Sequence, residues 1–373
     1  MVIKKMDDKN ILNVAIIGCG LIADQHAACV RSLSRCNIVA ACDSEEMMAQ
    51  QLADRFHIPH VFTDVGDMLQ SVRPTVVHIT TPPQSHFSLG RKCLEAGCHI
   101  YIEKPFTVTT AEAEDLIQLA ERKNLRITVG HNLQFTPEAI RMRALIEEGF
   151  LGGPPVHIES IQCFSHDEPT YGKTVLGDPN HWVRQLPGSL LHNLISHGVS
   201  KIAEFMQGAK PTVVSINFRS PYIKQLGQMD IMDEVRAFIQ DEKGITGFFL
   251  FTTQFGIGDN ELRLYGKEGN LVIDHTCRTI IKIRPSRQKS YMRYFFAPLS
   301  QAREYMNNTF RNIMLFARKE FHMDSGMKKL VELFYAAVRD NNKPDPISHA
   351  EILRTSCIME AIFQNVPKSM TEK

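Results

Sequence analysis

A glycine-rich segment near the start of the chain has residue types that suit phosphate binding. The apolar run Asn13–Ile17 leads directly into Gly18-Cys19-Gly20-Leu21-Ile22-Ala23, which has the spacing G-x-G-x-x-A. The first glycine permits a tight turn, the second lets the backbone approach a pyrophosphate, and the small third residue lets a helix pack close to the strand. The helix N-terminus presents N–H groups and the positive end of its dipole. Gly18, Gly20, Leu21 and Ile22 are therefore predicted to bind a dinucleotide.

An acidic residue at a suitable distance extends this prediction. Residues 37–42 read as a second apolar strand, and Asp43 follows it, 23 residues after Gly20. A carboxylate there can accept hydrogen bonds from the adenosine ribose hydroxyls and would repel a 2′-phosphate, so NAD is predicted in preference to NADP. Taken alone, the glycine motif fits an ordinary strand-to-helix turn equally well, and Asp43 fits a simple turn residue.

The elements around these residues alternate between strand and helix. Further strands are predicted at 61–62, 75–79, 98–102 and 126–129, with helices between them at 24–33, 45–56, 65–71, 87–96 and 110–123. This alternation is typical of an α/β fold with a doubly wound parallel sheet, whose ligands bind at the C-terminal ends of the strands. The loops at Gly18, Asp43, Thr81, Glu103 and His131 are therefore expected to line one crevice.

The pattern changes near residue 134, where we place a domain boundary. Helices are predicted at 137–148 and 190–206, an extended run at 155–164, and strands at 212–218, 234–240, 246–255, 261–265, 270–274 and 279–284. Short turns between consecutive strands indicate a mainly antiparallel sheet. The prediction is thus an N-terminal Rossmann domain of residues 1–133 and a C-terminal α/β domain of residues 134–373 with an open, mainly antiparallel sheet.

Residues 299–318 are predicted to form a long amphipathic helix. Its apolar stripe contains Ala302, Tyr305, Met306, Phe310, Ile313 and Met314, and the polar side carries Arg and Lys residues. The polar side is interpreted as a solvated face rather than a nucleic-acid surface.

The composition is that of an ordinary globular chain. Its 373 residues, 43% hydrophobic and 22% charged, are enough for two domains. A formal net charge of +1 gives no global reason to expect nucleic acid or membrane partners. No apolar run could span a bilayer and no signal peptide is evident, so a cytoplasmic protein is expected. The nine cysteines include no CxxC pair, and no metal site is predicted.

Four stretches together resemble the Gfo/Idh/MocA family of oxidoreductases, which includes glucose–fructose oxidoreductase and inositol dehydrogenase. They are GCGLIADQH at 18–26, TPPQSH at 81–86, EKPFTVTTAEAEDL at 103–116 and LLHNLISHG at 190–198. The resemblance implies a Rossmann domain joined to a C-terminal α/β domain, whose sheet makes the contact in a homodimer or homotetramer.

The resemblance also implies that Lys104 is the active-site lysine and His197 the catalytic histidine. A histidine can take the alcohol proton while hydride leaves carbon for the nicotinamide, and a lysine ammonium can stabilise charge on the substrate oxygen. The family commonly has Asp four residues before this histidine, where this chain has Asn193. Asn193 can orient the imidazole but supplies no charge, so we expect a lower pKa for His197 than an Asp would give.

The remaining predicted contacts lie in loops. Cofactor contacts are expected from Thr81, Pro82, His86, Glu103 and Lys104. Substrate contacts are expected from Lys104, His131, Asn132, His181, Trp182, Asn193 and His197. Polar side chains beside the single tryptophan suit a sugar, although a surface loop with one buried anchor explains them equally well.

Three functions fit this site. The first is an NAD(P)-dependent dehydrogenase acting on a secondary alcohol of a sugar, nucleotide sugar or cyclitol. The second is a redox-neutral glycosidase, lyase or epimerase that recycles tightly held NAD. The third, a non-catalytic NAD-binding regulator, is disfavoured because both Lys104 and His197 are present.

Overall fold

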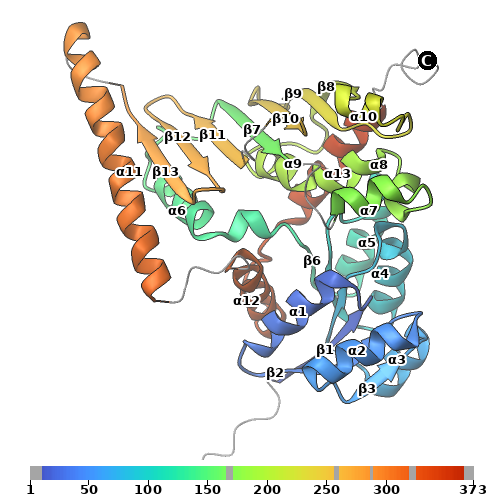
Figure 1. Ribbon diagram of the computed structural model, residues 1–373. Coiled ribbons are helices and arrows are strands. Elements are labelled where there is room, and N and C mark those ends of the chain that lie inside the picture. Colours follow the sequence, from blue (N-terminus) through green and yellow to red (C-terminus); the bar gives the residue numbers. More distant parts are fainter. Residues whose placement is uncertain (1–10, 165–170, 256–259, 286–288, 319–324, 365–373) are drawn as a thin grey trace, which may run out of the picture. The chain divides into compact units, whose positions relative to one another are not determined.

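The computed structural model describes residues 11–164, 171–255, 260–285, 289–318 and 325–364 (Figure 1). The chain divides into two compact units, residues 1–130 with 327–349, and residues 131–326 with 350–373. The division at residue 130 is close to the predicted domain boundary. Residues 327–349, however, were assigned to the C-terminal domain from the sequence, and they belong to the first unit. In the part of the chain that the structure describes, no helix is both long and apolar enough to cross a membrane.

The first unit contains a six-stranded sheet in which all neighbouring strands are parallel. Its order is β3 (His60–Phe62), β2 (Cys36–Cys42), β1 (Leu12–Ile17), β4 (Val76–Ile79), β5 (His99–Ile102) and β6 (Ile127–Val129). Its helices are α1 (Leu21–Arg31), α2 (Glu46–Phe56), α3 (Val65–Val72), α4 (His86–Glu95), α5 (Thr110–Arg122) and most of α12 (Ser325–Arg339). All residues of β4 and β6 are buried, as expected for parallel strands covered on both faces. The predicted doubly wound parallel sheet is confirmed.

The second unit is built on a seven-stranded, mainly antiparallel sheet. Its order is β13 (Thr279–Ile283), β12 (Asn270–Asp274), β11 (Asn260–Tyr265), β7 (His157–Cys163), β10 (Thr246–Thr252), β9 (Glu234–Gln240) and β8 (Thr212–Phe218). Only β7 and β10 pair in parallel among these strands. The helices are α6 (Pro137–Glu147), α7 (Tyr171–Gly177), α8 (Ser189–Leu194), α9 (Ser196–Ala203), α10 (Pro221–Gln225), α11 (Arg293–Ala317) and most of α13 (His349–Gln364). The prediction of an open, mainly antiparallel sheet is confirmed.

Three helical segments differ from the predictions. The helix predicted at 190–206 is two helices, because α8 ends and α9 begins on either side of Ile195. Helix α7 lies between the extended run predicted at 155–164 and the helix predicted at 190–206, where no helix was predicted. Helix α11 begins at Arg293, earlier than the predicted start at residue 299, and includes Pro298.

A buried lysine lies in the core of the second unit. Lys201 of α9 is 1% exposed, and its Nζ donates a hydrogen bond to Asn260 Oδ1 over 2.6 Å. Burial lowers the pKa of Lys201 to about 7, although the nearby charge of Glu138 opposes this shift. The folded chain therefore holds Lys201 at the edge of deprotonation near neutral pH.

The low pKa of Lys201 predicts that stability rises with pH above neutrality. Between about pH 7 and 10.5 the unfolded lysine keeps a proton that the folded lysine has released, so raising the pH favours the folded state. From pH 7 to 9 we expect about 2 kcal/mol of added unfolding free energy from this group. Urea unfolding should show the rise in the wild type and in the exposed control Lys92→Met, and a smaller rise in Lys201→Met. Equal slopes in all three proteins would contradict the prediction.

Candidate functional site

The glycine loop after β1 has the backbone that its sequence predicts. Gly18 has φ +88°, and a Cβ added there would lie 2.6 Å from Thr81 Cγ2 and 2.8 Å from Thr81 N. At Gly20, which precedes α1, a Cβ would meet no atom within 4 Å. Gly18 is therefore required by the fold itself, whereas Gly20 leaves open space at a helix N-terminus. This is the cradle that a pyrophosphate needs, and it fits the predicted dinucleotide.

Asp43 lies beside this loop, because β1 and β2 are adjacent parallel strands. Its Oδ2 accepts a hydrogen bond from Cys19 N over 2.7 Å, and its Oδ1 accepts one from Glu45 N over 3.0 Å. The half-buried carboxylate is thus held at the sheet edge where a ribose is expected. Burial and the Asp43 charge raise the pKa of Cys19 to about 12, so this cysteine is a neutral thiol.

His86 joins two of the loops that the sequence assigned to the cofactor. Its Nε2 lies 2.8 Å from the carbonyl oxygen of Thr81 and its Nδ1 lies 3.0 Å from that of Pro105. The ring is fully buried, and burial lowers its pKa. His86 was predicted to bind the cofactor directly. That contact stays a prediction, and in the structure the His86 ring holds the Thr81–Pro82 loop against the turn that carries Lys104.

Glu103 is a buried carboxylate directly after β5. Its Oε1 lies 2.9 Å from His26 Nε2, and its Oε2 accepts a hydrogen bond from Lys104 N over 3.0 Å. A Cβ at Gly130 would lie 2.7 Å from Glu103 Oε1, so the end of β6 needs a glycine there. Burial by itself would raise the pKa of Glu103, but the hydrogen bond with His26 and the Lys104 charge lower it. These contacts favour an ionised, buried Glu103, and its contact with the cofactor stays a prediction.

Lys104, the predicted active-site lysine, is half-buried at the same strand end. Burial lowers its pKa, and the Glu103 charge opposes that shift. Because β1, β4 and β5 are neighbouring parallel strands, Lys104 lies on the sheet edge that also carries the Gly18 and Thr81 loops. Within the first unit, the loops at Gly18, Asp43, Thr81 and Glu103 thus follow strands of one parallel sheet and lie at one edge, as predicted, whereas the fifth predicted loop, at His131, belongs to the second unit.

A buried chain of hydrogen bonds extends from Glu103 into the core. His26 Nδ1 lies 2.7 Å from His78 Nδ1, and His78 Nε2 lies 2.8 Å from the hydroxyl of Tyr335. Burial and then the nearby His26 hold the pKa of His78 well below its usual value, so His78 is neutral. If Glu103 is ionised and both histidines are neutral, one arrangement satisfies every contact. Tyr335 donates to His78, His78 donates to His26, and His26 donates to Glu103.

The sequence analysis did not predict this series of buried hydrogen bonds. The available signal was His78, a single polar residue within the apolar strand Val76–Ile79. A buried histidine must find a partner, but the sequence does not say which one.

In the second unit, two of the predicted histidines lie near each other. His131 Nε2 is 3.0 Å from Ser196 Oγ, and the ring centroids of His131 and His197 are 6.4 Å apart. His131 is buried, His197 is half-buried, and Asn193 on α8 is 7% exposed. Asn132 follows His131 and is half-buried. The structure therefore assembles His131 and His197 as a polar pair at the start of α9.

His181 and Trp182 belong to a different local cluster of the second unit. His181 Nδ1 accepts a hydrogen bond from Val183 N over 3.3 Å, and the two rings are 5.4 Å apart. Trp182 packs against a hydrophobic cluster that contains Val183, Leu190 and Ile223. These contacts support the interpretation of Trp182 as a buried anchor. A substrate role for His181 and Trp182 stays a prediction. Within the described part of the chain, no group of three or more His, Cys, Asp or Glu residues could hold a metal ion.

Alanine substitutions at Gly18 and Gly20 are expected to change different properties, namely stability and cofactor binding. Gly18→Ala should lower the unfolding free energy by more than about 1 kcal/mol, because of its positive φ and the contact with Thr81. Gly20→Ala should leave stability nearly unchanged but weaken NADH binding at least roughly tenfold, because the methyl group occupies pyrophosphate space. Urea unfolding and NADH fluorescence titration measure the two effects. Unchanged NADH affinity in Gly20→Ala would place the cofactor elsewhere.

The buried chain predicts a stability loss on removal of one hydroxyl. Tyr335→Phe removes the hydroxyl that lies 2.8 Å from His78 Nε2, so a buried ring nitrogen loses its partner at a cost of about 1–3 kcal/mol. The control is Tyr294→Phe, the same change at a side chain that is 79% exposed. We expect a lower urea midpoint for Tyr335→Phe only. Equal midpoints for the two variants would show that the chain adds nothing to stability.

Comparisons with known proteins agree with this geometry. The model of the Gfo/Idh/MocA family, described as an oxidoreductase family with an NAD-binding Rossmann fold, matches residues 12–131. D-glucoside 3-dehydrogenase of Escherichia coli K12 is 33% identical over 142 residues, which is 38% of this chain and 40% of that relative's length.

Solved structures extend the similarity of fold over nearly the whole chain. UDP-N-acetylglucosamine 3-dehydrogenase GnnA from Acidithiobacillus ferrooxidans superposes with a TM-score of 0.71 at 17% identity, covering 97% of this chain and 99% of that one. The WlbA dehydrogenase from Bordetella pertussis, in complex with NADH and UDP-GlcNAcA, gives a TM-score of 0.75 at 14% identity, with 95% of each chain covered. The match to the Gfo/Idh/MocA family model covers residues 12–131, which form most of the first unit, and over the rest of the chain these comparisons show a similarity of fold.

Proposed function

We propose that this protein is an NAD-dependent dehydrogenase that transfers hydride between nicotinamide and a secondary alcohol or ketone of a sugar or nucleotide sugar. The observation that carries the proposal is Lys104, a half-buried cation at the strand edge that also holds the Gly18 loop and Asp43. The relatives named above act on or bind sugars and nucleotide sugars, which supports this substrate class.

Each catalytic residue has one role in the proposed reaction. Bound NAD supplies the hydride acceptor. The Lys104 ammonium donates a hydrogen bond to the substrate oxygen and stabilises negative charge there, and the buried Glu103 favours this charged form. The His197 imidazole takes the hydroxyl proton, with Asn193 orienting its ring. The preference for NAD over NADP rests on Asp43, since its carboxylate lies beside the glycine loop and would repel a 2′-phosphate.

The sheet of the second unit also supports the proposed homodimer or homotetramer. Strands β8 and β9 expose several large apolar side chains on one stretch of sheet, namely Val214, Ile216 and Phe238. Apolar side chains at a sheet surface are typical of a contact between subunits.

The proposed reaction predicts large losses from two substitutions. A screen of sugars and nucleotide sugars, followed by nicotinamide absorbance, should find a substrate that is oxidised faster with NAD than with NADP. With that substrate, Lys104→Met and His197→Gln should each lower kcat by about 10²–10⁴-fold while NADH still binds, because each removes a group that acts in the transition state. The exposed Lys92→Met is the matched control and should keep full activity. Full activity in Lys104→Met would overturn the assignment.

A further inference from the structure

Helix α11 is fixed to the sheet of the second unit through its polar side. Asn308, only 6% exposed, accepts a hydrogen bond from Ile280 N over 3.0 Å and donates one to Ile280 O over 2.8 Å. Glu304 pairs with Lys282 over 3.3 Å. These contacts follow the edge strand β13, beside which α11 runs in Figure 1. The helix therefore covers an open sheet edge by supplying polar partners to its backbone.

The apolar stripe of α11 consequently faces solvent. The side with the arginines was interpreted as a solvated face, and Arg293, Arg303 and Arg318 are indeed exposed, but the apolar stripe is exposed as well. Ten large apolar residues of this one helix are between 44% and 79% exposed, namely Tyr294, Phe295, Phe296, Leu299, Tyr305, Met306, Phe310, Ile313, Met314 and Phe316. Together they expose roughly 1,000 Å², since an aromatic side chain alone carries about 150–250 Å². The largest apolar patch of a typical monomer is about 300–600 Å².

The unpaired charges that α11 and the residue after it carry have one sign. Arg293, Arg303 and Arg318 are exposed near its start, middle and end. The single acidic residue of α11, Glu304, is already paired with Lys282 on the opposite side. The exposed face of α11 thus combines aromatic and aliphatic side chains with cations and offers no anion.

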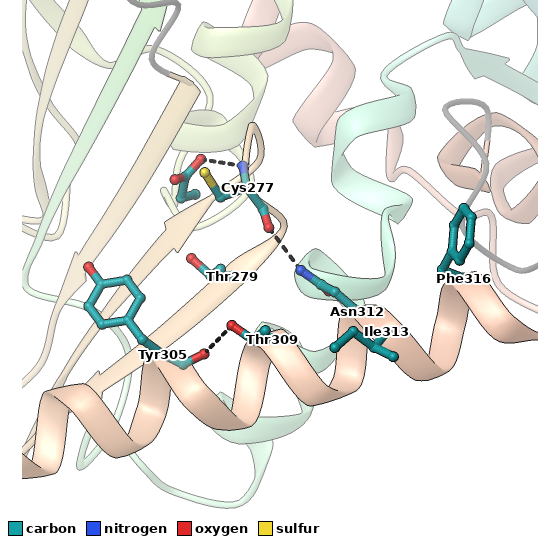
Figure 2. Close-up of a pocket in the computed structure, with 8 residues that line it drawn as sticks. Cys277, Thr279, Tyr305, Thr309, Asn312, Ile313 and Phe316 are labelled. Carbon is teal, nitrogen blue, oxygen red and sulfur yellow. Dashed lines mark hydrogen bonds between the residues drawn. The ribbon is translucent and has the colours of Figure 1, made fainter.

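An apolar groove continues the same face. Figure 2 shows Tyr305, Ile313 and Phe316 of α11 lining a hollow of about 460 Å³ beside the β12–β13 turn. The groove's backbone is tied down, since Asn312 Nδ2 donates to Cys277 O over 3.0 Å. The groove is therefore a fixed extension of the stripe.

We propose that α11 docks this protein onto the surface of an anionic membrane, with the helix axis in the membrane plane. The apolar stripe would enter the boundary between headgroups and acyl chains, and the three arginines would contact lipid phosphates. A second copy of the chain fits this face less well, because it would bring the same arginines, and the one acidic side chain that lines the groove, Asp274, already accepts hydrogen bonds from Thr276 N and Cys277 N. The net charge of +1 does not reveal this surface, because the charge of the remaining chain offsets it.

Vesicle flotation with the full chain tests the proposal. The wild type should float with phosphatidylcholine–phosphatidylglycerol vesicles, much less with phosphatidylcholine alone, and less again as salt is added. Phe310→Asp should weaken binding at least tenfold, because it places a charge in the apolar stripe. The double variant R303Q/R318Q should weaken it roughly fivefold for each arginine removed.

Matched controls make the same chemical changes on the first unit. Met47→Asp, at a side chain that is 72% exposed, and the double variant K92Q/R122Q should bind as the wild type does. Thermal unfolding and molar mass by light scattering accompany every variant. The proposal is overturned if the wild type does not float with anionic vesicles, or if Phe310→Asp floats equally well. It is also overturned if the wild type is a dimer that does not bind vesicles and Phe310→Asp converts it to a monomer. The stripe would then be a contact between subunits.

Discussion

A buried carboxylate places the strongest demand on the first unit. An unpaired buried charge costs about 3–5 kcal/mol, so Glu103 must be compensated from several directions. His26 of α1 supplies one contact, the backbone N–H of Lys104 supplies another, and Gly130 leaves the room that the carboxylate needs. These contacts fix the ends of β5 and β6 relative to α1. Lys104 gains its position, and part of its charge stabilisation, from a residue that has no direct chemistry of its own.

The hydrogen bonds that begin at this carboxylate also involve helix α12, which comes late in the sequence and belongs mostly to the first unit. If Glu103 is ionised and both histidines are neutral, the hydrogen bonds through His26 and His78 have one direction and end at a donor. That donor is the hydroxyl of Tyr335, 257 residues away from His78 in sequence. The ring of His78 also stacks on Tyr101 at 4.8 Å between centroids. Helix α12 therefore supplies a hydrogen-bond partner to a buried histidine of the Rossmann core, and it also packs against that core.

Features that depend on local sequence patterns could be predicted from the sequence. Features that depend on which distant residue a side chain contacts could not. Parallel strands such as β4 are continuous apolar runs, and Gly18 is recognisable by its motif, so the sheet and the glycine loop were predictable. The link from His78 to Tyr335 joins residues with no shared local signal. The periodicity of α11 gave its two faces correctly, but periodicity cannot say which face will find a partner within the chain.

Helix α11 is attached to its unit through polar side chains, so its apolar stripe does not have to be buried within the fold. A helix held by hydrophobic packing would lose its main attachment if its stripe were turned to solvent. Helix α11 is attached through Asn308 and Glu304 instead, so its position does not depend on burial of Phe310 or Ile313. Its stripe can therefore bind and release a surface while the sheet edge stays covered. Reversible association needs this separation, because the same contacts cannot both hold the fold together and remain free for a partner.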